Sequence, residues 1–415
     1  MKLYTADRML TQTESGDITN GAAVLVAKGR IAWAGRAADF PASNYPEALP
    51  TREFGDATLL PGLIDAHVHL GFDGGANPVQ RMMAETDAEQ LLLMVRSARE
   101  LLSVGVTTAR DLGARSYLDV TVRDAITAGV LQGPRLLTAG SPITTTGGHC
   151  WFMGGEADGA HEVRKLVRTH HRAGVDTLKI MATGGFMTAG SAPWFAQFEH
   201  DALAAAVDEA HRLNKQVAAH AHGVAGIERA IAVGVDTIEH CSFVHEDGSH
   251  ALVPELADRL AAAQVAVSPT CNFRTVAMHE ASGGQFTPPV AELHDRGVTI
   301  IASTDSGIDH TPHHAYVGAL EAMHFFGMSR DAVLASATSV AASVLGLSHE
   351  TGRIEAGLAA DLLAVRGDPR NDLADLRQLE LVLARGTEFV PDALSPLPEF
   401  DLAQSPMAAQ FGGVR

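Results

Sequence analysis

The stretch that decides the fold is PGLIDAHVHL, residues 61–70, an apolar run that ends with two histidines separated by one valine. Successive side chains of a β-strand point to opposite faces, so His67 and His69 would share one face and aim at the same point. The chain contains 20 histidines, so one such pair is weak evidence by itself. The rest of the sequence decides whether other polar side chains meet it there.

Short β-rich runs alternate with longer helix-like stretches from residue 63 to residue 346. The Ala-rich segment 198–215, with apolar residues at helical spacing, is one of the predicted helices. This alternation predicts parallel strands joined by crossover helices, and eight strands predict an α/β fold of the (β/α)8 TIM barrel type. The eight predicted strands are residues 63–70, 106–113, 135–140, 176–185, 216–223, 235–241, 265–270 and 298–307.

Both ends of the chain have a different, β-rich pattern. Residues 21–35 predict a hairpin that turns at Lys28-Gly29, and residues 352–365 predict further short strands. The last segment mixes Pro, Gly and polar residues without periodicity, which suits a loose arm or an oligomer contact. The predicted division is a small β-sandwich-like domain from residues 1–57 and 347–391, a barrel over residues 58–346 and a C-terminal tail over residues 392–415.

Composition limits the partners of the chain. The 31 basic and 49 acidic side chains give a net charge of -18, which disfavours binding to nucleic acid. No apolar run is long enough to span a membrane and no signal peptide is recognisable. Cys150, Cys241 and Cys271 are too few for a disulfide framework and are expected to be free thiols. We expect a cytoplasmic homo-oligomer that acts on a small molecule, with no nucleic acid or membrane partner.

The C-terminal ends of the predicted strands carry a convergent set of polar residues, at the place where active sites of (β/α)8 enzymes lie. Singly, His240 suits a core histidine, Asp305 a helix cap and Lys179 a surface lysine. Jointly they favour a metal site, because a lysine in the apolar run TLKIM is costly to bury unless it is neutralised or paired. The set is His67, His69, Lys179, His220, His222, His240 and Asp305.

These motifs resemble the metal-dependent amidohydrolase superfamily over almost the whole chain. GLIDAHVHL, TLKIMATGG, AHAHG, DTIEHC and STDSG are similar to its motifs on strands one, four, five, six and eight. SATSVAASVLGL followed by GRIEAGLAADLLAV is similar to its closing helix and β segment. Within the superfamily the chain looks most like the imidazolonepropionase-like branch with Xaa-Pro, Xaa-Arg and Xaa-Lys dipeptidases and ochratoxin amidohydrolase.

The resemblance implies a centre with two divalent metal ions, usually zinc. One ion would be held by His67, His69 and Asp305, and the other by His220 and His240. Lys179 would bridge them as an N6-carboxylated lysine, since a protonated amine cannot bind a cation. A hydroxide shared by the two ions would attack the substrate, and Asp305 would act first as general base and then as general acid.

Four residues are candidates for substrate contact. His222 should face the same interior as His220, and His149 follows the third predicted strand beside two glycines, so both are candidate catalytic and substrate-binding residues; a structural histidine is the alternative for each. Trp194 lies in an aromatic, Gly-rich loop that suits a substrate cover, or anchors that loop instead. Arg274 is a candidate partner for a substrate carboxylate, with a surface arginine as the alternative.

Three residues beside these motifs are predicted to be structural. Arg110 and Asp111 match the family, and a buried ion pair between them is the simplest explanation. Cys241 should point away from His240 by strand alternation, so it is predicted to pack against the helices.

The predicted reaction is hydrolysis of an amide bond in a dipeptide or an N-acyl amino acid. Hydrolysis of cyclic amides, carbamates, ureas or phosphotriesters would use the same metal centre and stays open. A mononuclear deaminase is disfavoured, because Gly223 stands where those enzymes place a glutamate. A non-catalytic scaffold is disfavoured, because every expected ligand is retained.

Overall fold

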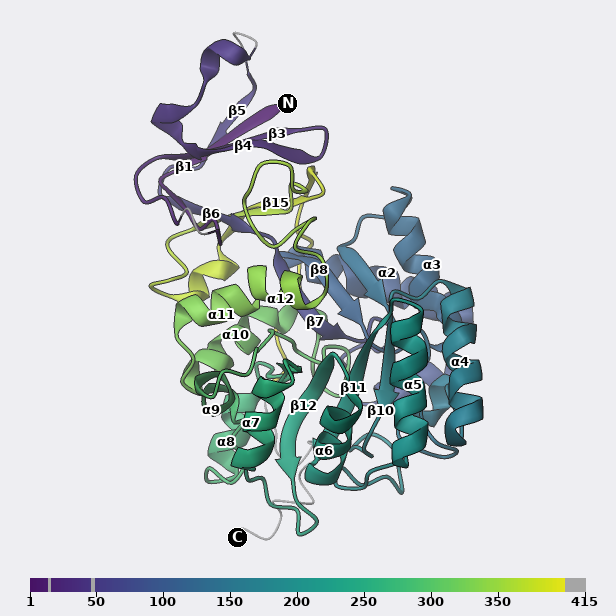
Figure 1. Cartoon of the computed structure of the whole chain (residues 1–415). Helices are drawn as coiled ribbons and strands as arrows, with labels where there is room; N and C mark the ends of the chain where they lie inside the picture. Colours follow the sequence, from purple (N-terminus) through teal and green to yellow (C-terminus); the bar gives the residue numbers. More distant parts are fainter. Residues whose placement is uncertain (14–15, 46–48, 400–415) are drawn as a thin grey trace.

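The computed structural model describes residues 1–13, 16–45 and 49–399 (Figure 1). Its central part has parallel strands in two sheets, ordered β7-β8-β9 and β10-β11-β12-β13. Seven of the eight predicted strands are confirmed, and the helices between them confirm an α/β fold. The strands are β7 (Leu63–Val68), β8 (Val106–Asp111), β9 (Arg135–Thr138), β10 (Thr177–Met181), β11 (Gln216–Gly223), β12 (Thr237–Val244) and β13 (Ala266–Ser268).

Amphipathic helices follow the strands, and α4 and α5 pack side by side on the outside of the parallel strands (Figure 1). The predicted helix within residues 198–215 is confirmed as α5. Its alanines pack towards the core while Asp201 and Arg212 remain exposed. The helices are α1 (Pro78–Ala84), α2 (Asp87–Ser103), α3 (Leu118–Thr127), α4 (Gly159–Ala173), α5 (His200–Arg212), α6 (Val224–Val233), α7 (Pro254–Ala262), α8 (Thr275–Ala281), α9 (Val290–Asp295), α10 (Tyr316–Phe325), α11 (Arg330–Ser336) and α12 (Ser339–Val344).

The eighth predicted strand, residues 298–307, is not a regular strand. Its backbone still joins β13 to β7: Ile301 N donates to Val267 O at 3.0 Å, and Asp305 N donates to His67 O at 2.9 Å. Between these points Thr304 N donates instead to a carboxylate oxygen of Asp65, at 3.1 Å. The side chain of Asp65 therefore replaces a ladder partner, and the segment is held by isolated bridges.

Two further sheets lie at the top of Figure 1. The sheet β4-β3-β1-β5 is built from the N-terminal end, and strands from both ends of the chain meet in the sheet β16-β15-β14-β6-β2. The hairpin predicted over residues 21–35 is confirmed, with Lys28 (φ 52°) and Gly29 (φ 77°) in its two-residue turn. Of residues 352–365, only the end of the segment forms a strand. The strands are β1 (Lys2–Ala6), β2 (Arg8–Met9), β3 (Ala22–Ala27), β4 (Arg30–Arg36), β5 (Thr51–Glu53), β6 (Ala57–Pro61), β14 (Leu362–Arg366), β15 (Leu379–Ala384) and β16 (Thr387–Phe389).

Two large apolar clusters stabilise these two parts. One fills the space between the parallel strands and their helices. The other lies between the end sheets and includes Tyr4, Val24, Leu59 and Leu362. Of the predicted tail, residues 392–399 carry no helix or strand, and residues 400–415 lie outside the described residues. Within the described part of the chain, every helix is too short or too polar to cross a bilayer.

Candidate metal centre and active site

The seven polar residues predicted to converge all line one cavity of about 170 Å³ at the C-terminal ends of the parallel strands. They arrive on β7, β10, β11, β12 and the irregular segment that follows β13, so the fold brings together residues that lie far apart in the sequence. His149 and Arg274 line the same cavity. The structure therefore unites all but one of the predicted site residues, the exception being Trp194.

The first histidine group consists of His67, His69 and Asp305. The Nε2 atoms of the two histidines are 3.2 Å apart, which confirms that residues 67 and 69 share a face. Asp305 Oδ1 lies 3.3 Å from His67 Nε2 and 3.1 Å from His69 Nε2. Burial raises the pKa of Asp305, but the two imidazoles and Lys179 outweigh it and hold this pKa well below its ordinary range. Asp305 is therefore a carboxylate.

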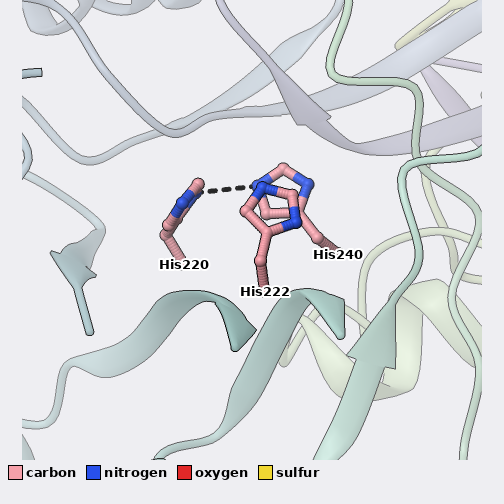
Figure 2. A group of neighbouring side chains, drawn as sticks. All are labelled: His220, His222 and His240. Carbon is pink, nitrogen blue, oxygen red and sulfur yellow. Dashed lines mark hydrogen bonds between the residues drawn. The ribbon is translucent and has the colours of Figure 1, made fainter. Parts of the chain in front are cut away.

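The second histidine group consists of His220, His222 and His240, whose rings point towards one another in Figure 2. His240 Nε2 lies 2.9 Å from His220 Nδ1, and the rings of His222 and His240 are stacked with centroids 4.2 Å apart. Burial holds the pKa of His220 and of His240 well below the ordinary value, and that of His222 at about 3. All three imidazoles are neutral at physiological pH.

Lys179 belongs to β10 and lies beside the first histidine group. Its side chain is 1% exposed, and Nζ is 3.4 Å from His67 Nε2. Burial lowers the pKa of Lys179 to about 8, against the opposing effect of Glu239 and Asp305. A substantial fraction of this amine is therefore neutral and nucleophilic near physiological pH.

The donor atoms fit a bound cation. Gly184 O can only accept a hydrogen bond, so its partner His220 Nε2, 3.0 Å away, carries the hydrogen and leaves a lone pair on Nδ1. In the same way the carboxylate of Glu239, 2.9 Å from His67 Nδ1, leaves a lone pair on His67 Nε2. In the first group this lone pair faces a carboxylate oxygen of Asp305 at 3.3 Å, and in the second the lone pair of His220 Nδ1 faces His240 Nε2 at 2.9 Å. Such a contact is favourable only when a proton or a cation lies between the two facing atoms.

The predicted ion pair between Arg110 and Asp111 is wrong. Arg110 NH2 donates to Glu239 Oε1 at 2.9 Å, while Asp111 accepts hydrogen bonds from the backbone of Leu70 and Gly113. Adjacent residues of β8 point to opposite faces, which keeps these two side chains apart. Arg110 instead reaches across the strands to the glutamate that orients His67.

His149 lies against His220, with ring centroids 4.6 Å apart. Gly185 allows this approach, because a Cβ there would lie 2.4 Å from His149 Nε2. Burial and the nearby Lys179 lower the pKa of His149 to about 3, so its imidazole is neutral. A neutral ring of this kind can donate one hydrogen bond into the cavity.

Arg274 and Trp194 differ in their relation to the cavity. Arg274 is 5% exposed and donates from NH1 to Asp309 O at 2.8 Å, so it is not a surface arginine. Trp194 is not among the described residues that line the cavity. Its backbone packs on Gly223, where a Cβ would lie 2.6 Å from Trp194 Cα. Phe186 and Met187 of the same loop do line the cavity.

Several residues at the site were not predicted. Glu239 orients His67, Thr270 Oγ1 lies 2.8 Å from His240 Nδ1, and Ser242 Oγ lies 2.6 Å from His222 Nδ1. Glu239 had a usable signal, because a glutamate in the apolar run DTIEHC is as costly to bury as Lys179. The two hydroxyl residues had none. Cys241 packs in the main apolar cluster, as predicted.

The chain is similar to known proteins over most of its length. A family model described as the amidohydrolase family matches residues 58–388. Ochratoxinase of Aspergillus niger is 29% identical over 399 residues, covering 86% of this chain and 80% of that protein. Imidazolonepropionase of Paracoccus denitrificans is 28% identical over 396 residues, covering 87% and 92%. The crystal structure of a Xaa-Pro dipeptidase with bound methionine is similar with a TM-score of 0.81 at 27% identity, covering 94% and 99%.

Proposed function

The chain belongs to the amidohydrolase family of hydrolases that act on amide carbon–nitrogen bonds, and from this premise we propose that it uses two bound metal ions to cleave a dipeptide or an N-acyl amino acid. The observation that carries the proposal is the meeting of two histidine groups and a buried lysine in one cavity. Each group offers donor atoms within 4.8 Å of one another, which suits one cation per group.

His67, His69 and Asp305 would hold one cation, and His220 and His240 the other. Imidazole donors suit zinc. Divalent cations bound there supply a Lewis acid for the substrate carbonyl and lower the pKa of a water molecule. Lys179, largely stripped of solvent and partly neutral, would react with carbon dioxide to give a carbamate and a proton, and the two carbamate oxygens would bridge the groups.

The remaining polar residues have distinct proposed tasks. Asp305, an ionised carboxylate between two imidazoles, would take a proton from the attacking water and return it to the departing amine. His149 and His222, both neutral, would donate hydrogen bonds to the substrate. Arg274 would bind a substrate carboxylate, since a guanidinium matches that group.

The family implies a TIM-barrel-like α/β fold, and we propose the finer division as well. Residues 58–346 would close a (β/α)8 barrel, supported by bridges from Ile143 to Ile180, from Val267 to Ile300 and from Val68 to Ser306. Residues 1–57 and 347–391 would form a small β domain, supported by the sheet that pairs β6 with β14.

The test combines metal analysis with a substrate screen of dipeptides and N-acyl amino acids against the zinc-loaded chain. We expect close to two zinc ions per chain, and loss of both binding and turnover in Lys179→Ala. Lys165→Ala, which removes an exposed lysine of α4, is the matched control and keeps both.

Three outcomes would contradict the proposal. Equal turnover by Lys179→Ala removes the bridging role of this lysine. One ion per chain favours a mononuclear centre. Turnover of esters or lactams alone moves the substrate to another class.

A further inference from the structure

We infer that the cavity selects, as the amine half of its substrate, an α-amino acid that carries a free carboxylate and an uncharged, apolar side chain. The inference rests on the proposed amide hydrolysis and adds the chemistry of the released group. Three observations carry it: the composition of one wall, the spacing of two residues around α8, and the acidic side chains along the cavity.

The cavity has an apolar wall in addition to its imidazoles. Phe186 and Met187 come from the loop after β10, Met278 from α8, Phe286 from the segment after α8, and Ile308 from the loop after Asp305. Aromatic and thioether side chains from separate segments therefore line one space. Such a wall favours an apolar group and adapts to its shape, because methionine is flexible.

Arg274 and Met278 bring a cation and the apolar wall together. Arg274 precedes α8, and Met278 N donates to Arg274 O at 2.9 Å, so the two residues lie one helical turn apart. Both line the cavity. An α-amino acid has its carboxylate and its side chain on the same carbon, so one such residue would reach Arg274 and this wall at once.

Phe286 is held in place beside this pair. Its backbone N donates to Ser282 Oγ at 3.0 Å, and its carbonyl accepts from His279 Nδ1 at 3.0 Å, which ties the segment after α8 back to the helix. Its ring meets the ring of His250 edge to face, with centroids 5.5 Å apart. Phe286 is therefore a fixed part of the wall near Arg274 and Met278.

The charges along the cavity disfavour a cationic side chain. Over the described residues, the acidic side chains that line it are Asp305 and Asp309. Asp305 belongs to the first histidine group. Burial raises the pKa of Asp309, against the opposing effect of His310 and Arg274, so this carboxyl group already faces two basic side chains of the chain itself. A substrate lysine or arginine would bury its charge against apolar side chains and near Arg274, which is costly without a carboxylate partner.

The experiment holds the acyl half constant as acetyl and varies the amine half, using the zinc-loaded full chain. The compounds are N-acetyl derivatives of phenylalanine, leucine, glycine, arginine and phenethylamine, which is phenylalanine without its carboxylate. We expect kcat/KM for the phenylalanine and leucine compounds to exceed that for each of the other three by about tenfold or more.

Variants assign this preference to residues. Phe286→Ala should raise KM for N-acetyl-phenylalanine and leave that for N-acetyl-glycine nearly unchanged, while Phe286→Leu keeps most of the preference. Arg274→Gln should remove the advantage of phenylalanine over phenethylamine. Leu92→Ala, at an exposed position of α2, is the control and changes neither ratio. Melting temperatures confirm that each variant is folded.

The outcomes separate the two claims. Cleavage of N-acetyl-arginine as fast as N-acetyl-phenylalanine overturns the inference while amide hydrolysis stands. Equal rates for phenylalanine and phenethylamine overturn the carboxylate contact. No cleavage of any N-acetyl compound or dipeptide by zinc-loaded chain overturns the proposed function itself.

Discussion

At the scale of single residues, Glu239 fixes the orientation of a proposed metal ligand. Its two carboxylate oxygens bind His67 Nδ1 and Arg110 NH2, each at 2.9 Å, with no exposure to solvent. Burial raises the pKa of Glu239, but Arg110 and His67 outweigh it and keep the residue ionised. Partners of this kind set both the tautomer and the basicity of a ligating imidazole.

We therefore predict that Glu239→Gln weakens zinc binding by about 10- to 100-fold. Competition with a chromophoric chelator measures this affinity without reference to catalysis. Glu228→Gln changes a glutamate on the surface helix α6 that pairs with Arg259, and should leave the affinity unchanged. An unaltered affinity in the Glu239 variant would show that His67 is oriented by other contacts.

Asp119 makes a second residue-scale prediction, on pH. Its carboxyl group is fully buried and accepts from Gly140 N at 2.7 Å, and burial raises its pKa to about 6. The folded state thus holds a proton that the unfolded state releases near pH 4, so the stability associated with this proton is lost as pH rises from about 4 through about 6.

Asp119→Asn keeps an acceptor for Gly140 N and removes the charge. The wild type should lose on the order of 2 kcal/mol more stability than the variant between about pH 4 and about pH 7.5. Melting temperatures of both proteins at the two pH values measure this difference. An effect of the substitution on stability that does not depend on pH is the same at both values and drops out. Parallel pH profiles would mean that Asp119 is ionised in the folded state throughout.

At the scale of secondary-structure elements, α2 begins with a capping box. Thr86 Oγ1 accepts from Glu89 N at 3.3 Å, and a carboxylate oxygen of Glu89 accepts from Thr86 N at 2.8 Å. Thr86→Ala should lower the free energy of unfolding by about 1 kcal/mol, whereas Thr86→Ser should keep most of it. Urea unfolding compares the two variants, and equal losses would rule out a capping contribution.

The same scale shows what the sequence could predict of the fold and the site. Alternation placed His67 beside His69 and His220 beside His222 at the ends of β7 and β11, although the pairing register of both strands shifts there. It could not predict the left-handed backbone at His240 (φ 67°), which lies within β12, or at Asp305 (φ 58°), which lies in the irregular eighth segment. Tertiary contacts impose this conformation, and the sequence near each residue carries no sign of it.

At the scale of the whole molecule, chain ends 300 residues apart form one sheet. β14 pairs antiparallel with β6, Leu363 opposite Leu60, and β15 covers the other edge of β14. Both strands are continuous apolar runs, so the sequence predicts that they are buried but does not specify which strand each one pairs with. Pairing at this distance depends on the central α/β unit, which brings residues 61 and 362 together.

The same central unit concentrates unfavourable electrostatics in one place, which gives a prediction for the whole molecule. Without a cation, the crowded imidazoles of the two histidine groups and the buried Lys179 oppose folding. A cation that binds the folded chain but not the unfolded chain adds RT ln(1 + [L]/Kd), about 3 kcal/mol at one hundred times Kd. Chelation should therefore lower the melting temperature by roughly 3 °C for each cation removed. Zinc should restore the melting temperature and magnesium should not, because the donors are mainly imidazoles.

In His220→Ala the chelator should have a smaller effect on the melting temperature, since part of the second histidine group is gone. The same melting temperature with and without chelator would contradict a metal centre at this cavity.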